Sequence, residues 1–356
     1  MIRVLVAEDS ATARALLVSL LSAEPDIVVV GEARMGVEAV RMAEALAPDL
    51  ITMDVQMPEL DGIEATKQIM TRTPRPILVV SSAADTDIEL SLEATRSGAL
   101  MVIAKPKGVH SPAHESDRRQ LVSMVRALAH VKVVRRHGSV APLAKFGGPT
   151  PAAFPALESI ARRPGQAFEV LAIAASTGGP AALQQILAKL PHDFPLPILI
   201  VQHIAHGFTA GLAHWLSGNS AIRVKLAELG EDARAGVAYV APDDRHIGIR
   251  RDATGRLRIQ LDNAAPVGTF RPSASYMFDS CAAVAGRGVL SLILTGMGDD
   301  GVEGLRAVRR HGGYVLAQDE ASSVIYGMPR EAQLAGVVDR VVSLDEVPRR
   351  LRELTS

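Results

Sequence analysis

Three side chains that together can cleave esters or amides stand near the ends of apolar runs in the second half of the chain. Ser176 and His203 each close such a run, and a carboxylate, Asp299 or Asp300, lies in a glycine-rich turn after a third. A hydroxyl, an imidazole and a carboxylate brought together form the nucleophile, base and orienting acid of acyl transfer. Backbone amides around Thr177 or Met297 could stabilise the tetrahedral oxyanion.

Taken alone, the serine turn has a simpler explanation. The segment Ser176-Thr177-Gly178-Gly179-Pro180 precedes a helical run, where a serine often only caps the helix. The histidine at a second strand end shifts the balance, because parallel strands bring their carboxyl ends to one edge of a sheet.

A metal site is a further alternative for this histidine. His203 and His206 are three residues apart, a spacing that suits a zinc ion, but the sequence holds one cysteine and no HExxH motif. We therefore expect no cofactor in the hydrolytic site.

A second group of chemically informative residues lies in the first third of the chain. Glu8 and Asp9, Asp54, Ser81 and Lys105 stand at the ends of four predicted strands. Any one acid could simply cap a helix, but agreement between four strand ends favours a shared pocket. Three carboxylates in one pocket repel each other unless a cation neutralises them, and oxygen-only ligands suit Mg²⁺. The layout predicts a carboxylate that accepts a phosphoryl group beside Mg²⁺, a lysine and a hydroxyl.

Both groups of residues require strands that are joined by helical connections. Short β-rich runs alternate with amphipathic stretches, so we predict an α/β protein with a doubly wound (βα)5 domain followed by a second doubly wound domain with a mainly parallel sheet. The expected strands of the first domain are Arg3–Ala7, Asp26–Val30, Leu50–Met53, Ile77–Ser81 and Leu100–Ala104, with a last helix near Ser116–His130. Those of the second are Glu169–Ala174, Ile198–Val201, Val237–Ala241, Gly288–Leu294 and Tyr314–Ala317, with helices at Ala181–Leu190 and around Ala332–Leu334.

The length of 356 residues suits two domains. The alternating pattern dissolves in a stretch rich in Gly, Pro, Ala and basic residues, which is typical of a linker. Its basic residues are scattered and lack aromatic partners, so a nucleic-acid-binding arm is not favoured. We expect domains over residues 1–130 and 167–356 and a linker over 131–166.

Composition restricts the classes of protein further. The net charge of −1 gives no whole-chain attraction to nucleic acid or to an anionic membrane. No apolar run reaches the roughly 18 residues that span a bilayer, and the first residues read as a strand rather than a signal peptide. The single cysteine, Cys281, excludes an internal disulfide and reads as a buried thiol. We expect a cytoplasmic monomer that neither inserts into membranes nor binds nucleic acid.

The first domain resembles a two-component receiver domain over about the first 125 residues. The motifs that carry the resemblance are Glu8-Asp9, the segment 53–62 (MDVQMPELDG), Ser81-Ser82 and Lys105-Pro106. The resemblance implies a histidine kinase of the chemotaxis type as phosphodonor. It also implies site roles: Asp54 as phosphoacceptor, Glu8, Asp9 and Asp54 as Mg²⁺ ligands, Ser81 as switch hydroxyl and Lys105 as phosphate contact. Val102 departs from the Tyr or Phe that receivers usually carry three residues before the lysine.

The second domain resembles the chemotaxis protein-glutamate methylesterase family. The matching segments are Ala175 to Gly179, Gln202-His203, Gly207 to Thr209, Val240 to Pro242, Arg271 to Ser273, Thr295 to Gly301 and Gly327 to Arg330. The resemblance implies that the domain hydrolyses glutamate methyl esters on chemoreceptor cytoplasmic helices and deamidates receptor glutamines, with phosphorylation relieving inhibition. It also implies Ser176 as nucleophile, His203 as base, Asp300 as third member of the triad and Met297 as part of the oxyanion hole. Departures from the family pattern stand at Ala174, at Ile204-Ala205-His206 and at Ser275.

Two other output functions remain possible from the residues. The second domain could bind a partner with an inactive triad, since a fold resemblance alone does not prove chemistry. A DNA-binding output is less favoured, because the second half lacks a basic recognition helix.

Overall fold

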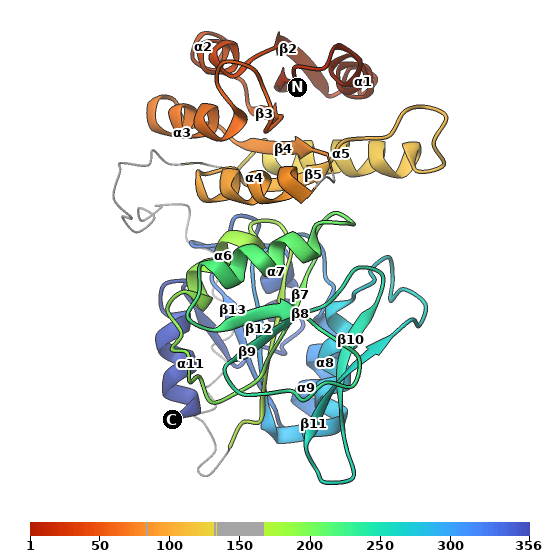
Figure 1. The fold of residues 1–356 in the computed structure, drawn as a ribbon, viewed down its shortest axis with the longest axis vertical. Coiled ribbons are helices and arrows are strands. Elements are labelled where there is room, and N and C mark those ends of the chain that lie inside the picture. The colour runs from red at the N-terminus through yellow and green to blue at the C-terminus, as the bar shows by residue number, and fades with distance from the viewer. Residues whose placement is uncertain (83–84, 132, 134–166) are drawn as a thin grey trace. The chain divides into compact units, whose positions relative to one another are not determined.

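The computed structural model describes residues 1–82, 85–131, 133 and 167–356. The chain divides into two compact units, and the division falls within the segment predicted as a linker (Figure 1). That segment, residues 131–166, lies almost entirely outside the described residues, so the linker and its boundaries stay a prediction. Among the described residues, no helix is both long enough and apolar enough to cross a bilayer.

The first unit is built on a five-stranded sheet. Its strands are β1 (Ile2–Ala7), β2 (Ile27–Ala33), β3 (Leu50–Met53), β4 (Ile77–Ser81) and β5 (Met101–Ala104). Its helices are α1 (Ala11–Ser22), α2 (Gly36–Leu46), α3 (Gly62–Arg72), α4 (Asp85–Arg96) and α5 (His114–Leu128). The strands are parallel in the order β2-β1-β3-β4-β5, which confirms the predicted doubly wound (βα)5 fold. The strand order reverses between β1 and β3, and ligands bind beside such a reversal.

Local sequence explains why helices begin soon after the strands that carry the acidic residues. The Ser10 hydroxyl caps α1 by accepting a hydrogen bond from the Ala13 amide, and Asp61 caps α3 by accepting one from the Glu64 amide. Such caps satisfy amides that have no partner inside the helix. The short loop between β1 and α1 therefore presents its carboxylates at the edge of the sheet.

The second unit contains a seven-stranded sheet and a separate hairpin. Its strands are β6 (Val170–Ala175), β7 (Ile198–Gln202), β8 (Arg223–Leu226), β9 (Val237–Val240), β10 (His246–Arg251), β11 (Leu257–Asp262), β12 (Val289–Ile293), β13 (Tyr314–Gln318) and β14 (Arg340–Val342). Its helices are α6 (Gly179–Leu187), α7 (Thr209–Gly218), α8 (Ala274–Ala285), the 3₁₀ turn η1 (Gly286–Gly288), α9 (Val302–Arg310), α10 (Met328–Leu334) and α11 (Val347–Thr355).

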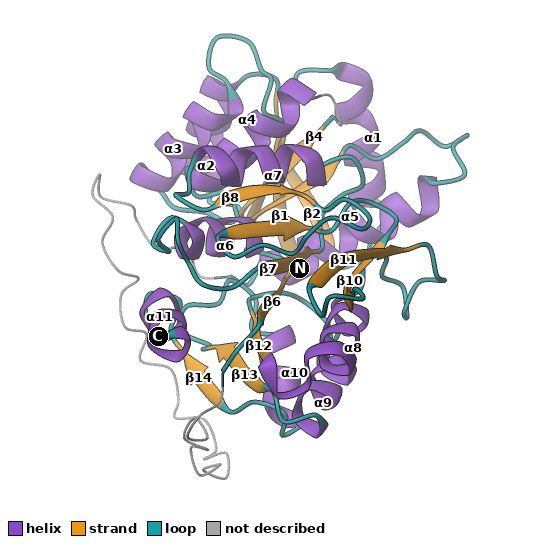
Figure 2. Ribbon diagram, turned by 60° about the horizontal axis from the view of Figure 1, so that its bottom comes forward, coloured by secondary structure: helices purple, strands orange, loops and turns teal. Residues whose placement is uncertain are grey.

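The large sheet is parallel throughout, in the order β14-β13-β12-β6-β7-β9-β8. Helices α8, α9 and α10 pack on one face, and α6, α7 and α11 cover the other (Figure 2). From β6 the chain proceeds to β7 in one direction, whereas from β12 it proceeds to β13 in the other. The strand order therefore reverses between β6 and β12, the two central neighbours.

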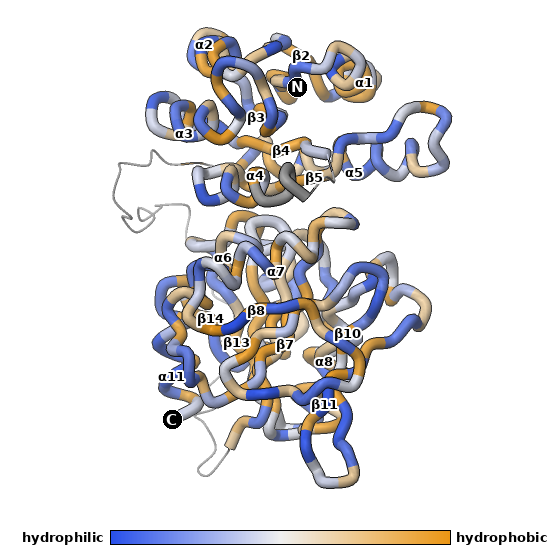
Figure 3. Tube along the Cα trace, in the orientation of Figure 1, coloured by the Kyte–Doolittle hydropathy of each residue, from blue (hydrophilic) through white to orange (hydrophobic). Residues whose placement is uncertain are grey.

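Four strands of this unit were not predicted from the sequence. Strands β8 and β14 are short edge strands, and β10 and β11 pair as an antiparallel hairpin outside the large sheet. The hairpin strand β11 alternates apolar and polar residues, in contrast to the continuous apolar runs of strands buried on both faces. Figure 3 shows this contrast, with β7 largely hydrophobic and much of the hairpin hydrophilic.

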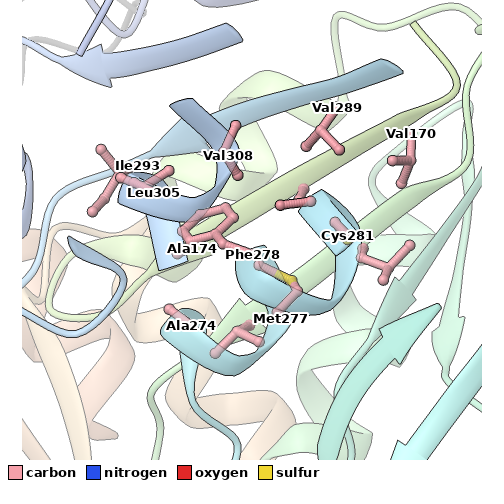
Figure 4. Packing of buried hydrophobic residues seen from close by; sticks show 14 of the residues in the cluster. Val170, Ala174, Ala274, Met277, Phe278, Cys281, Val289, Ile293, Leu305 and Val308 are labelled. Carbon is pink, nitrogen blue, oxygen red and sulfur yellow. The ribbon is translucent and has the colours of Figure 1, made fainter. Parts of the chain in front are cut away.

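The core of the second unit forms where α8 packs against β6 and β12. Phe278 and Cys281 of α8 are fully buried there, among Val170, Ala174 and Ile293 (Figure 4). Burial raises the pKa of the Cys281 thiol to about 12, because a thiolate would have no water or cation to stabilise it. The predicted buried thiol is confirmed, and α8 is fixed firmly against the sheet.

Candidate functional site

The acidic residues of the first unit converge where the strand order reverses. Glu8 and Asp9 follow β1 and Asp54 follows β3, and one carboxylate oxygen of each lies within 4.8 Å of the others. The Lys105 ammonium lies 2.8 Å from the Asp54 carboxylate and 3.0 Å from that of Glu8. The Ser81 hydroxyl is buried without a hydrogen-bond partner among the described residues. All five predicted residues therefore come from the carboxyl ends of β1, β3, β4 and β5.

Burial makes the acids of this cluster unusual. The pKa of Glu8 is raised to about 7, first by burial and then by the nearby Asp54 charge. Burial also raises the pKa of Asp54, although the hydrogen bond from Lys105 opposes the change. For Lys105, burial acts to lower the pKa, but its bonds to the two carboxylates outweigh burial and raise it. The single positive charge of Lys105 does not neutralise the negative charges of these acids. Their oxygen-only ligand set fits Mg²⁺.

Arg14 supports this cluster and was missed from the sequence. Its guanidinium donates hydrogen bonds to the Glu8 and Asp9 carbonyl oxygens, at 2.8 and 3.2 Å. A usable signal was present, because Arg14 lies three residues before Leu17 on the apolar face of α1. A charged residue on such a face usually has a partner below it.

In the second unit, the serine and the histidine stand side by side. The last paired residues of β6 and β7 are Ala175 and Gln202, so Ser176 and His203 follow in the same register. The Gln202 side-chain amide donates hydrogen bonds to the carbonyl oxygens of Ser176, at 2.7 Å, and of His203, at 2.9 Å. Gln202 thus clamps both strand ends, a role that sequence reasoning missed. Its signal is a polar residue that closes a buried apolar strand.

The carboxylate reaches the histidine from the turn after β12. His203 Nε2 lies 2.9 Å from the Asp300 Oδ2 atom. The same carboxylate accepts hydrogen bonds at the N-terminus of α8 from the Ser273 hydroxyl at 2.8 Å, the Ala274 amide at 2.7 Å and the Ser275 amide at 3.0 Å. Burial alone would raise the pKa of Asp300, but the hydrogen bond and charge of His203, followed by the bonds from the Ala274 and Ser275 amides, outweigh burial and lower the pKa to about 2. Asp300 is therefore a firmly ionised partner for the imidazole.

The other ring nitrogen of His203 is free to act as a base. His203 Nδ1 is buried with no hydrogen-bond partner among the described residues, and the ring stacks on Phe270 with centroids 4.1 Å apart. No hydrogen bond joins the Ser176 hydroxyl to this nitrogen within the described part of the chain. Catalytic bonds in substrate-free structures are often long and tighten when substrate binds. The roles of Phe270 and Ser273 depend on tertiary contacts, and only Ser273 had a sequence signal, as an N-cap before a helical run.

Backbone amides next to the serine are available to an oxyanion. Within the described residues, the N–H groups of Thr177 and Met297 bond to no acceptor. The two turns that carry them are held together, since the Ser176 amide donates to the Thr295 carbonyl at 3.0 Å and the Thr295 hydroxyl donates to the Thr177 carbonyl at 2.9 Å. Thr177 directly precedes the N-cap residue of α6, where the helix dipole favours negative charge.

His206, the second histidine of the possible zinc site, pairs with Asp244 rather than sharing a ligand position with His203. His206 is 74% exposed and its Nε2 atom pairs with Asp244 at 3.0 Å, whereas the Nε2 atom of His203 is committed to Asp300. Within the described ranges, the acids Glu8, Asp9 and Asp54 make up the one group of potential ligands close enough to share a metal ion. The geometry therefore favours acyl transfer over metal-assisted hydrolysis in the second unit.

Comparison with known proteins agrees with the division of the chain into two units. The sequence model of the response regulator receiver domain matches residues 4–111, and that of the CheB methylesterase family matches residues 171–351. A crystal structure of the Thermotoga maritima CheB methylesterase catalytic domain is 37% identical. It matches with a TM-score of 0.52 and covers 53% of this chain and 99% of that one.

Similarity to other proteins extends along almost the whole chain. Protein-glutamate methylesterase/protein-glutamine glutaminase 4 of Myxococcus xanthus is 51% identical over 98% of this chain and 96% of its own length. Protein-glutamate methylesterase/protein-glutamine glutaminase 3 of Anaeromyxobacter dehalogenans is 48% identical over 99% of this chain and 98% of its own length. The chain therefore belongs to the family of protein-glutamate methylesterases/protein-glutamine glutaminases, enzymes that here combine a receiver domain with a CheB methylesterase domain.

Proposed function

We propose that the protein is a phosphorylation-activated hydrolase that removes methyl groups from glutamate methyl esters on chemoreceptor cytoplasmic helices, releasing methanol, and that also deamidates receptor glutamines. The observation that carries the proposal is the partly buried hydrogen bond of 2.9 Å between His203 and Asp300, at the strand end beside Ser176. Names of relatives support the substrate class.

In the first half of the proposed reaction, the Ser176 oxygen attacks the ester carbonyl while His203 takes the hydroxyl proton. The tetrahedral oxyanion then accepts hydrogen bonds from the Thr177 and Met297 amides, each of which typically stabilises it by about 3 kcal/mol. Asp300 stabilises the imidazolium and fixes its orientation. His203 returns the proton to the methoxy oxygen, methanol leaves, and a glutamyl ester of Ser176 remains.

In the second half, a water molecule repeats the same steps. His203 removes a proton from the water as it attacks the glutamyl ester, and returns that proton to the Ser176 oxygen as the bond breaks. The product is an unmodified glutamate side chain. With a glutamine substrate, ammonia takes the place of methanol in the first half.

Control of the enzyme is proposed to reside in the first unit. Asp54 accepts the phosphoryl group from a histidine kinase. Glu8, Asp9 and Asp54 would hold Mg²⁺, and Lys105 and Ser81 would contact the phosphoryl oxygens. Mg²⁺ would offset the charge of the transferred phosphoryl group. We also propose that the receiver spans residues 1–130 and the methylesterase domain residues 167–356, in a monomeric cytoplasmic protein.

Methanol release from methylated receptor membranes tests both parts of the proposal. Ser176→Ala should abolish release while the chain stays folded, and undiminished release would refute the serine assignment. Acetyl phosphate with Mg²⁺ should raise the rate of the wild type but not of Asp54→Asn. Equal stimulation of both proteins would exclude control through Asp54. The neighbouring exposed acid gives a matched control, because Asp299→Asn should retain the wild-type rate.

A further inference from the structure

A second buried histidine, His246, lies close to the candidate triad without belonging to it. It begins β10 and is fully buried. Both of its ring nitrogens are engaged by backbone groups: Nδ1 lies 3.2 Å from the Ser273 amide nitrogen and Nε2 lies 3.1 Å from the Ala265 carbonyl oxygen. Its ring stacks on Tyr276 with centroids 4.5 Å apart. The imidazole is therefore held on its edges and on one face.

These two contacts fix the protonation pattern of the ring. The Ser273 amide can only donate a hydrogen bond, so Nδ1 of His246 must be the unprotonated acceptor. The Ala265 carbonyl can only accept, so Nε2 must carry the hydrogen. His246 is thus a neutral imidazole in a single tautomer, which serves as acceptor on one edge and donor on the other.

The two backbone groups lie at opposite ends of one loop. The loop follows β11, whose last residue pairs with His246, and it leads into α8. Within it, Phe270 stacks on the ring of His203. At its end, the Ser273 hydroxyl donates to Asp300. One buried side chain therefore ties down both ends of the segment that contacts the base and the acid of the candidate triad.

We propose that His246 is a positioning residue for hydrolysis: it holds the segment 264–273 so that Phe270 and the N-terminus of α8 orient His203 and Asp300. This inference rests on the proposed function, because it presumes that His203 and Asp300 act on substrate. His246 itself touches no reacting atom. A misplacement of about 1 Å in such a site can lower the rate on the order of 100-fold, so the support matters to catalysis.

Two substitutions separate the contacts of His246. The side-chain oxygen of asparagine stands as many bonds from Cβ as Nδ1 of histidine, so His246→Asn can still accept the Ser273 bond. The side-chain nitrogen of glutamine stands as far along its chain as Nε2, so His246→Gln can still donate to Ala265 but leaves the Ser273 amide without an acceptor. We expect His246→Gln to lower kcat for methanol release roughly 10- to 100-fold with little change in KM. His246→Asn should retain most of the wild-type kcat.

A spectroscopic readout distinguishes positioning from general stability. The proton shared by His203 Nε2 and Asp300 should give a downfield NMR resonance that is retained in His246→Asn and is shifted or lost in His246→Gln. The control His311→Gln alters an exposed histidine that also bonds a backbone carbonyl, at 2.9 Å from Ala307, and should leave kcat and the resonance unchanged.

The outcomes separate this inference from the proposed function. If Ser176→Ala is inactive but His246→Gln retains wild-type kcat and resonance, the inference about His246 is wrong and the proposed function stands. If Ser176→Ala remains active, the proposed function itself fails. Should His246→Gln not fold, Phe270→Leu removes the stacking partner of His203 from a half-exposed position and should lower kcat in the same range. Wild-type kcat in that variant would overturn the proposal.

Discussion

Replacing Asp300 by asparagine should damage both catalysis and stability, for reasons that can be worked out separately. The carboxylate accepts four hydrogen bonds, from His203, the Ser273 hydroxyl and the amides of Ala274 and Ser275. Its Oδ2 atom faces two of these donors, His203 Nε2 and the Ala274 amide. In Asp300→Asn, an NH₂ group that occupies this position would face these two N–H donors with another donor, so neither bond could form.

The catalytic loss follows from the tautomer of the histidine. An amide NH₂ opposite Nε2 favours the His203 tautomer with the hydrogen on Nδ1, which leaves no lone pair on Nδ1 to take the serine proton. The corresponding substitution in a serine-protease triad lowers kcat about 10⁴-fold. We expect a fall in kcat for methanol release of the same order, and KM should change little because Asp300 is not proposed to contact the substrate.

The loss of stability has a pH dependence whose sign is set by the pKa. In the folded protein, against the opposing effect of burial, the hydrogen bond and charge of His203 hold the pKa of Asp300 at about 2, below its ordinary value of 3.8. A lowered acid pKa contributes stability that is fully present above about pH 4 and is lost as the pH falls through about 2. The difference corresponds to about 2 kcal/mol at pH 7. Wild type and Asp300→Asn should therefore differ by at least this amount at pH 7, and the gap should narrow by about 1 kcal/mol at pH 3.

The single tryptophan makes this measurement specific to one domain. Trp215 lies in α7 of the second unit and is largely buried, so its fluorescence during urea unfolding reports on that unit. Asp299→Asn is the matched control and should lose neither activity nor stability. A gap between wild type and Asp300→Asn that stays constant from pH 7 to pH 3 would refute the electrostatic reasoning. Wild-type kcat in Asp300→Asn would refute the catalytic reasoning.

Three further predictions test other parts of the molecule. Gly296→Ala should lower kcat at least about 100-fold without unfolding the chain, because the added Cβ would lie 2.6 Å from the Ser176 Cβ; an unchanged rate would show that the turn yields without cost. Cys281 should resist alkylation at pH 8 in the native protein and react in urea, as mass spectrometry can follow; rapid native labelling would contradict its burial. Asp54→Asn should leave the first unit as stable as the wild type or more stable, since burial raises the pKa of that acid. Lys105→Met should instead lower the free energy of unfolding by about 3 kcal/mol, because it leaves buried carboxylates without their cation. Hydrogen exchange in β1 and β3 measures both effects, and the opposite order of stabilities would contradict the charge argument.

Sequence reasoning predicted the placement of a candidate residue best where that residue directly follows a buried strand. Asp54, Ser176 and His203 all stand at such positions, where an apolar run identifies the strand and parallel pairing brings the ends together. The apolar run of β12 and the glycine-rich turn after it led to the adjacent acids Asp299 and Asp300, and the family resemblance selected Asp300.

The residues that support these side chains were harder to predict. His246 lies in a hairpin whose strands were not predicted, and Phe270 lies in the loop that follows it. The roles of both depend on ring stacking and on backbone contacts between distant segments. Spacing in the sequence carries no information on a ring face or on the carbonyl that an imidazole meets. Arg14 and Gln202 are intermediate cases, because a polar residue within an apolar pattern marks a contact without identifying the partner.

The candidate triad and the core of the second unit are connected through the N-terminus of α8. That helix has its own cap, since the Ser273 hydroxyl accepts a hydrogen bond from the Tyr276 amide, and Asp300 accepts from two more groups in the first turn. The carboxylate that orients His203 is thus also a counter-charge to the helix dipole. Because α8 packs against β6 and β12, any movement of the helix would carry Asp300 with it. The geometry of the His203–Asp300 pair is therefore set by the core of the unit, and core substitutions along α8 should change kcat before they unfold the chain.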